Sequence, residues 1–299
     1  MRFISYRRGN TTGVALQLED GHYHGLDQAD LGFPGKLNQL LRAGAGALAN
    51  AANILTRSGK PVDLAACALL PPITAPGKII RVRPSYPDRS REEGCEKPAC
   101  AHVSVLSRIN LIGQNASLRQ PREATLLGYD GELVAVMGRV GNCLSHDSAL
   151  SYVAGYTVFS CPVFNGEQVS SSHWSGDRRF DENGAMGPAL VTVDEVPCGA
   201  AGLRIRTKLN EMTLHETGTS ESAISVADAV SLVSAVMTLM PGDLIIIGLA
   251  CSVVPLTLSN PPGAGDICEV QIDQIGTLRN VLGKCETSPP TAMRSHSFR

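Results

Sequence analysis

The sequence predicts an α+β protein that is rich in β-structure and carries a small N-terminal β/α extension. Short apolar runs bounded by glycine, proline and aspartate recur along most of the chain, which is typical of strands. Three segments, residues 35–59, 145–155 and 225–239, have the composition and start signals of helices instead. The 299 residues are enough for one large domain with a small extension.

The small N-terminal domain is expected over residues 1–75. Residues 2–26 alternate apolar and polar side chains around two glycine-containing turns, which predicts a small β-meander. Residues 35–59 are rich in alanine and leucine and predict a helix that is interrupted around Gly44 and Gly46. The proline-rich residues 68–78 mark the linker to the next domain.

The second domain is expected over residues 76–285. Its predicted strands are the apolar runs "KIIRV", "ELVAVMG", "GYTVFS", "ALVTVD", "LRIRTKL", "DLIIIG" and "CEVQI". Ser145 and Ser225 are suited to cap the first turns of two helices, and Pro241 is expected to end the second one. The polar, proline-containing residues 286–299 predict a disordered tail.

The composition excludes several kinds of partner. The formal net charge is -2, which gives no reason to expect a nucleic acid. The longest apolar run, residues 244–256, is too short to span a membrane, and the first residues lack an apolar signal, so we expect a cytoplasmic protein. The nine cysteines lack the spacing of a zinc site and are expected mostly as buried thiols.

Five phrases of the second domain carry a more specific signal. In chain order they are "YDGELVAVMGRVG", "ALSYVAGYTVFS", "FDENGAMGPALVT", "TLMPGDLIIIG" and "GAGDICEVQIDQIGTLRN". With them, the chain from Lys78 to Val281 resembles the fumarylacetoacetate hydrolase (FAH) family. The resemblance implies a rolled, mixed β-structure that commonly forms a homodimer and binds a small-molecule substrate. Members cleave 1,3-dicarbonyl acids, decarboxylate or tautomerise 2-oxo acids, or dehydrate related sugar acids, usually around Mg²⁺ or Mn²⁺.

Within this resemblance, Asp130, Glu132 and Cys161 stand at the positions of three metal ligands. One residue separates Asp130 from Glu132, so both lie on one face of a strand, because side chains alternate. The third position usually holds an aspartate, and the thiol of Cys161 is a poor ligand for hard Mg²⁺. We therefore expect no cofactor, or a weakly bound Mg²⁺, Mn²⁺ or Zn²⁺.

The resemblance also implies a catalytic set, Glu92, His102, Gln168 and Arg178. Gln168 keeps the family's residue type, and Arg178 keeps the positive charge of a lysine. Glu92 aligns with a segment that is mobile in the family, in which members carry a histidine and a glutamate that activate water. Arg89 replaces that histidine and cannot act as a base, since arginine stays protonated. His102 stands near a substrate-facing lysine position, and its imidazole is a candidate acid or base.

A second set is implied in substrate binding. It consists of Tyr86, Arg89, Asn165, Thr219 and Leu249. Leu249 stands in a loop where a threonine hydroxyl often contacts the substrate carboxylate. Its apolar side chain therefore predicts a less acidic and more lipophilic substrate.

Ordinary structural interpretations compete with these assignments. Asp130 and Glu132 can be solvated residues on an exposed strand face, and Cys161 can be a small apolar residue of the core. Arg89 can form a surface ion pair with the glutamate three residues later. Arg178 can belong to a solvated basic turn.

Three functions follow from these observations. The favoured one is a FAH-like enzyme that acts on an enolisable 1,3-dicarbonyl or 2-oxo acid-like compound by C–C cleavage, isomerisation or ring closure, without the usual Mg²⁺. One alternative is a conventional metal-dependent C–C hydrolase or decarboxylase that uses Asp130, Glu132 and Cys161. The other is a non-catalytic relative that binds a ligand or a partner. Intact scaffold phrases around altered site positions favour the first.

Overall fold

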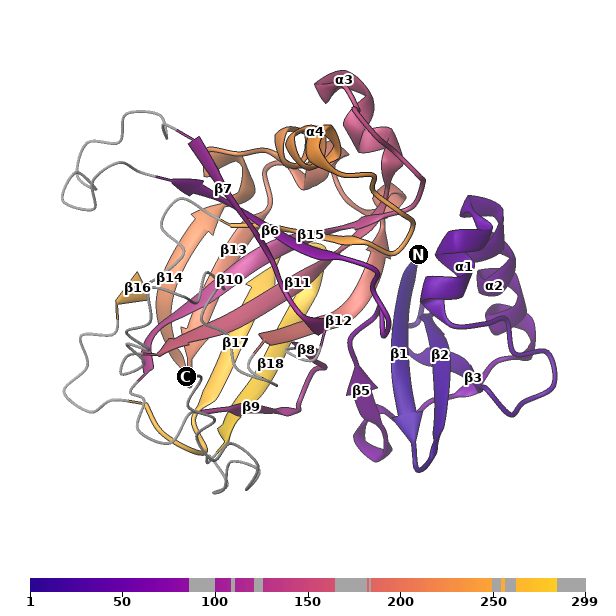
Figure 1. Cartoon of the computed structure of the whole chain (residues 1–299). Coiled ribbons are helices and arrows are strands. Elements are labelled where there is room, and N and C mark those ends of the chain that lie inside the picture. Colours follow the sequence, from indigo (N-terminus) through magenta and orange to yellow (C-terminus); the bar gives the residue numbers. More distant parts are fainter. Residues whose placement is uncertain are drawn as a thin grey trace, which may run out of the picture.

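The computed structural model describes residues 1–85, 100–108, 111–120, 126–164, 182, 184–248, 254–255 and 262–283. Strands dominate these residues, as the sequence predicts for a β-rich α+β protein with an N-terminal β region. Figure 1 shows the α-helices gathered in two places, with α1 and α2 beside the first strands and α3 and α4 together at one end of the fold. None of the helices in the described ranges is long and apolar enough to cross a membrane.

Among these residues, thirteen strands form one large sheet. Its main path runs β4–β3–β2–β1–β12–β11–β10–β15–β6–β7, while β5 pairs with β1, β8 with β12 and β16 with β10. The strands are β1 (Arg2–Arg8), β2 (Thr11–Gln17), β3 (Tyr23–Asp27), β4 (Lys60–Pro61), β5 (Ala68–Leu70), β6 (Ile79–Ser85), β7 (Cys100–Val105), β8 (Leu111–Ile112), β10 (Leu126–Met137), β11 (Val153–Phe164), β12 (Gly184–Thr192), β15 (Leu244–Ile247) and β16 (Val254–Pro255).

A second sheet packs against one face of the first. Its order is β14–β13–β17–β18–β9. The strands are β9 (Ser117–Arg119), β13 (Arg204–Leu209), β14 (Met212–Gly218), β17 (Ile267–Ile272) and β18 (Gly276–Gly283). Gly131 of β10 lets the two sheets approach closely, because a Cβ atom there would lie 2.6 Å from Val270 and 2.8 Å from Thr207.

Helices α1 (Leu37–Ala43) and α2 (Ala45–Ser58) confirm the interrupted helix that the sequence predicts. The break falls at Gly44, whose φ of 95° lies in the region that favours glycine. Leu41 and Leu55 are buried in the core that these helices share with the large sheet. The alanine and leucine residues of this segment therefore cover one face of the sheet.

Helices α3 (His146–Ala149) and α4 (Val226–Val236) begin after the predicted N-caps. Ser225 forms a capping box with Asp228, three residues later. The prediction that the second helix continues to Pro241 was wrong. Leu239 is extended instead, and its backbone forms a bridge with Gly141 through hydrogen bonds of 2.8 and 3.0 Å. Short 3₁₀ turns cover Leu64–Ala66, Leu150–Tyr152, Val193–Glu195, Cys198–Ala200 and Thr219–Glu221.

The N-terminal strands extend the same large sheet as the rest of the chain. Strand β1 pairs with β12 in antiparallel register, with Arg2 opposite Val191 and Phe3 opposite Leu190. The domain boundary near residue 75 stays a prediction. The tail, residues 286–299, lies outside the described residues.

Candidate functional site

Strand β10 has two faces, and the candidate site lies on one of them. Its odd-numbered residues Leu133, Ala135 and Met137 belong to the core between the two sheets. The even-numbered Val134 and Val136 belong instead to the core that contains α1 and α2. Because side chains alternate along a strand, positions 130 and 132 lie on this second face of the large sheet.

The three predicted metal positions fall on this face together. Asp130 lies opposite Cys161 in the antiparallel register of β10 and β11, and Glu132 lies opposite Phe159. Residues directly opposite in such a pair have Cβ atoms about 5 Å apart. The thiol of Cys161 is buried in the same core as Phe159. The register thus brings two acidic positions and one thiol into a small area.

Glu132 is bound there by Arg81, from β6. The Arg81 Nε and Nη2 atoms both donate to Glu132 Oε1, at 2.9 and 2.6 Å. The pair is almost fully buried, with 2% of the Arg81 side chain and 0% of the Glu132 side chain exposed. Hydrogen bonds between charged groups in such surroundings are short and strong, so this pair fixes the carboxylate in place.

Arg83 and Gly248 lie beside this pair. The Arg83 Nε is 4.0 Å from Glu132 Oε1, and its side chain is 27% exposed. A Cβ atom at Gly248 would lie 2.5 Å from the Arg83 Cγ and 2.9 Å from Glu132 Oε1. Only glycine at position 248 therefore leaves room for the arginine and the carboxylate to approach each other.

His102 stands at the rim of the same group. It lies opposite Arg83 in the antiparallel pairing of β6 and β7, just as Ser104 lies opposite Arg81. Residues in direct register share a face, so the exposed His102 is on the side of the sheet that carries Glu132. His102 therefore shares a face with Glu132, but strands β6 and β15 lie between its strand, β7, and β10.

The donors on this face do not suit a hard divalent cation. Glu132 Oε1 already accepts two hydrogen bonds from a guanidinium, and a cation bound there would lie beside that positive charge. Cys161 offers sulfur, which Mg²⁺ and Mn²⁺ bind poorly, and its Sγ donates to the carbonyl oxygen of Pro162 at 3.4 Å. In the part of the chain that the structure describes, no three His, Cys, Asp or Glu residues are grouped to hold a metal ion.

One atom of this group is left for a ligand. Glu132 Oε2 is buried and has no hydrogen-bond partner among the described residues. Buried carboxylate oxygens normally accept a hydrogen bond, because desolvating them is otherwise costly. A hydroxyl, an enol or a water molecule that donates to Oε2 would complete the site.

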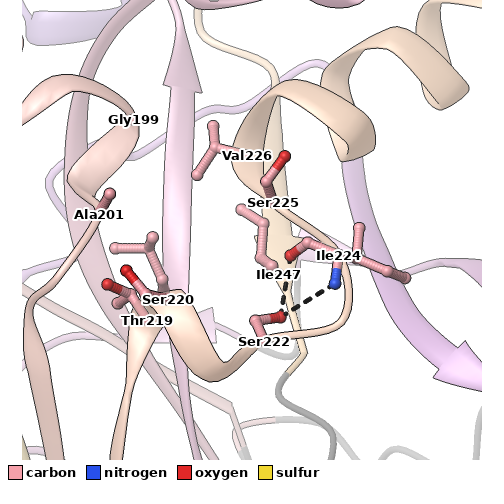
Figure 2. A pocket seen from close by; sticks show the side chains of 10 residues that line it. Gly199, Ala201, Thr219, Ser220, Ser222, Ile224, Ser225, Val226 and Ile247 are labelled. Carbon is pink, nitrogen blue, oxygen red and sulfur yellow. Dashed lines mark hydrogen bonds between the residues drawn. The ribbon is translucent and has the colours of Figure 1, made fainter. Parts of the chain in front are cut away.

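Thr219, predicted to bind substrate, lies on the other face of β10. Figure 2 shows it in a pocket with Ile247 and Val226, and Leu133 lines the same pocket. Its hydroxyl serves the fold, since it donates to the Ala200 carbonyl at 2.7 Å and accepts from the Leu203 amide at 3.0 Å. Thr219 is therefore not brought together with Glu132.

The opposite face of β11 is likewise separate from the Glu132 group. Ser160 and Tyr129 form a buried hydroxyl–hydroxyl contact there. Burial raises the pKa of the Tyr129 phenol well above its usual value, so this group stays protonated. Seven other predicted site residues lie outside the described residues. They are Tyr86, Arg89, Glu92, Asn165, Gln168, Arg178 and Leu249.

Sequence reasoning missed Arg81, Arg83 and the role of Gly248. The available signal was the run "KIIRVR", in which two arginines at alternate positions interrupt a buried strand. A charged residue inside such a run is rarely buried without a partner. That partner, Glu132, is 51 residues away in the sequence.

Comparisons with known proteins agree with this architecture. Residues 78–282 match the sequence profile of the family described as fumarylacetoacetate (FAA) hydrolase C-terminal. Protein Rv2993c of Mycobacterium tuberculosis is 32% identical over 75% of this chain and 82% of its own length. The oxaloacetate tautomerase fahd2, mitochondrial, of Xenopus laevis is 26% identical over 94% of this chain and 89% of its own. The structure of 2-hydroxyhepta-2,4-diene-1,7-dioate isomerase from Mycobacterium marinum aligns with a TM-score of 0.69 and 26% identity, over 95% of this chain and 98% of that chain.

Proposed function

Because the chain belongs to the fumarylacetoacetate hydrolase family, we propose that it is an enzyme that moves a proton within an enolisable 2-oxo acid or 1,3-dicarbonyl acid. The reaction is a tautomerisation or isomerisation: a proton leaves the carbon beside a carbonyl group and a proton returns to another atom of the same molecule. It takes place on the Glu132 face of the large sheet, without Mg²⁺.

The observation that carries this proposal is the buried Arg81–Glu132 pair with Arg83 beside it. Removing a proton beside a carbonyl group leaves negative charge on the carbonyl oxygen. Fixed positive groups in a site with little water stabilise that charge without having to reorganise. The Arg83 side chain is 27% exposed, whereas that of Arg81 is 2% exposed, so Arg83 lies nearer the surface of this face.

Two groups are candidates to handle the proton. Glu132 Oε2 is the acceptor that the described residues leave unused. The imidazole of His102, opposite Arg83, is a second candidate acid or base on this face. Their positions on one face support a proton transfer between substrate and protein. Glu92, Gln168 and Arg178 stay predicted contributors.

Isomerisation is favoured over C–C cleavage for two reasons. Cleavage by water needs an activated water molecule, and Arg89 stands where the resemblance places the histidine that would activate it. In addition, two of the relatives that align over most of this chain are named as a tautomerase and an isomerase. A homodimer and a cytoplasmic location stay predictions.

The test is a proton-exchange assay on enolisable 2-oxo acids, beginning with oxaloacetate. Ketonisation is followed by the loss of enol absorbance, and exchange at the carbon beside the carbonyl is followed by NMR in D₂O. Glu132→Gln is expected to lower the rate on the order of 10²-fold. Glu216→Gln is the matched control, since Glu216 also pairs with an arginine but on the surface. No acceleration by folded protein across the panel, or equal rates for wild type and Glu132→Gln, would refute the proposal.

A further inference from the structure

We infer that Arg81 takes at Glu132 the place of a divalent cation, so that a guanidinium built into β6 replaces a bound metal ion. This inference rests on the same site as the proposed function. Arg81 is buried and acts through its contact with Glu132, which makes it a positioning residue. Its role is to hold the carboxylate and to keep cations out.

The strand order explains how Arg81 reaches the carboxylate. Strand β15 lies between β6 and β10, and Ile246 of β15 is in register with Arg81 on one side and Val134 on the other. The Arg81 side chain therefore has to reach across β15, because its hydrogen-bond partner, Glu132, is on β10 beyond that strand. Gly248 follows the end of β15 and has no side chain to fill the space between the two outer strands.

The hydrogen bonds favour a guanidinium over a metal ion. The Arg81 Nε and Nη2 atoms both donate to one oxygen, Oε1, so a cation at that oxygen would have to displace these two bonds. The displaced group keeps its charge, since arginine does not lose its proton in proteins. It would then lie buried beside the incoming cation, with the Arg83 Nε also 4.0 Å from the same oxygen.

The consequence is a site that rejects Mg²⁺ and Mn²⁺ until Arg81 is removed. The register offers a way to test this, because position 161 lies opposite Asp130 on the same face. Cys161→Asp adds an oxygen ligand but leaves Arg81 on Glu132. Only the combination Arg81→Met with Cys161→Asp supplies a third acidic position and releases the carboxylate.

Binding of Mn²⁺ alone is measured by titration calorimetry and by the EPR signal of the free ion. We expect wild type and Cys161→Asp to show no saturable binding at sub-millimolar Mn²⁺. The double variant is expected to bind at least on the order of tenfold more tightly than Cys161→Asp, a size typical for residues that orient metal ligands. Adding Glu132→Gln should abolish that gain. Arg206→Met with Cys161→Asp is the matched control and should gain nothing.

Two results would overturn the inference: saturable Mn²⁺ binding by wild type, or Cys161→Asp binding as tightly as the double variant. If the double variant does not fold, the wild-type titration still tests the inference. The variant Arg81→Lys/Cys161→Asp then replaces the unfolded one, and we expect it to gain an intermediate affinity for Mn²⁺. Activity before and after EDTA separates this inference from the proposed function. Turnover that depends on Mn²⁺ would sink the inference alone, whereas absent turnover with no Mn²⁺ binding would sink the function alone.

Discussion

Replacing Arg81 by methionine is expected to lower the free energy of unfolding by about 3–5 kcal/mol, the usual cost of removing one partner from a buried ion pair. Methionine keeps an unbranched side chain but removes the hydrogen bonds to Glu132 Oε1 at 2.9 and 2.6 Å. The carboxylate is 0% exposed, so solvent cannot replace the lost donors. It stays as a buried charge that has lost its nearest counter-ion.

This loss is large enough to appear as a shift in melting temperature. The entropy of unfolding is about 2.1 cal/mol/K per residue, so for 299 residues it is on the order of 0.6 kcal/mol/K. A loss of 3–5 kcal/mol then lowers Tm by roughly 5–8 °C. Differential scanning calorimetry measures the shift. Glu132→Gln and the double variant Arg81→Met/Glu132→Gln complete a cycle in which the double variant should lose less than the sum of the single variants.

The surface pair Arg206–Glu216 provides the control. Its Nε–Oε2 distance is 2.7 Å, but the side chains are 26% and 42% exposed. Exposed ion pairs contribute about 0–1 kcal/mol, so Arg206→Met should lower Tm by no more than about 2 °C. Equal shifts for Arg81→Met and Arg206→Met, or strict additivity in the cycle, would refute the reasoning that burial makes the Arg81–Glu132 pair essential.

Three further predictions concern other parts of the chain. Gly248→Ala should lower the proposed proton-exchange rate on the order of 10²-fold, because the added Cβ would lie 2.9 Å from the Glu132 carboxylate and displace it. Cys268 should react with maleimide at pH 8 far more slowly than the exposed Cys143, since burial raises the pKa of its thiol to about 12; peptide mapping by mass spectrometry measures both. Ser225→Ala should lower the free energy of unfolding in urea by about 1 kcal/mol, because it removes the N-cap of α4.

Each has a result that would contradict it. Gly46→Ala is the control for Gly248→Ala, since a Cβ at position 46 meets nothing within 4 Å; equal activity of the two variants would mean that the close contact at Gly248 does not matter. Cys268 reacting as fast as Cys143 would show that the second sheet opens readily and that the thiol is not protected.

The Ser225 prediction also has a pH dependence. The hydrogen bond from Ser225 lowers the pKa of the Asp228 carboxyl below its ordinary value. A lowered folded-state pKa stabilises the fold above the unfolded pKa, which is about 3.9, and this contribution disappears as the pH falls through the lowered value. The difference between wild type and Ser225→Ala should therefore shrink in acid. A difference that is unchanged at pH 2 would mean that the capping box is not its cause.

The fold class was predictable because the alternation along the strands and the punctuation by glycine and proline are local features. Gly44 interrupts the first helical segment as expected, since its backbone conformation requires glycine. The end of α4 was not predictable in the same way. Residues up to Leu239 continue an apolar helical pattern, but the backbone of Leu239 pairs with Gly141, almost a hundred residues earlier. A pairing between distant segments has no local signal.

In the candidate site, too, local sequence patterns predicted some features, whereas pairings between distant strands could not be predicted. Period-2 alternation was enough to place positions 130 and 132 on one face, and the register of β10 and β11 adds Cys161. The Arg81–Glu132 pair could not be predicted, because it depends on β15 lying between β6 and β10. That order brings together residues from three strands that are distant in the sequence. The family resemblance therefore revealed the unusual thiol but not the arginine that accompanies it.

The thiol and the arginine make physical sense as a pair. A divalent cation carries two positive charges, whereas the Arg81 guanidinium that binds Glu132 carries one. Without a third carboxylate at position 161, this face has less negative charge for its positive groups to balance. A carboxylate at position 161 would instead add another buried negative charge to this face, which is costly in such surroundings. On this argument Cys161 is a consequence of Arg81, and it serves the site by being small and uncharged.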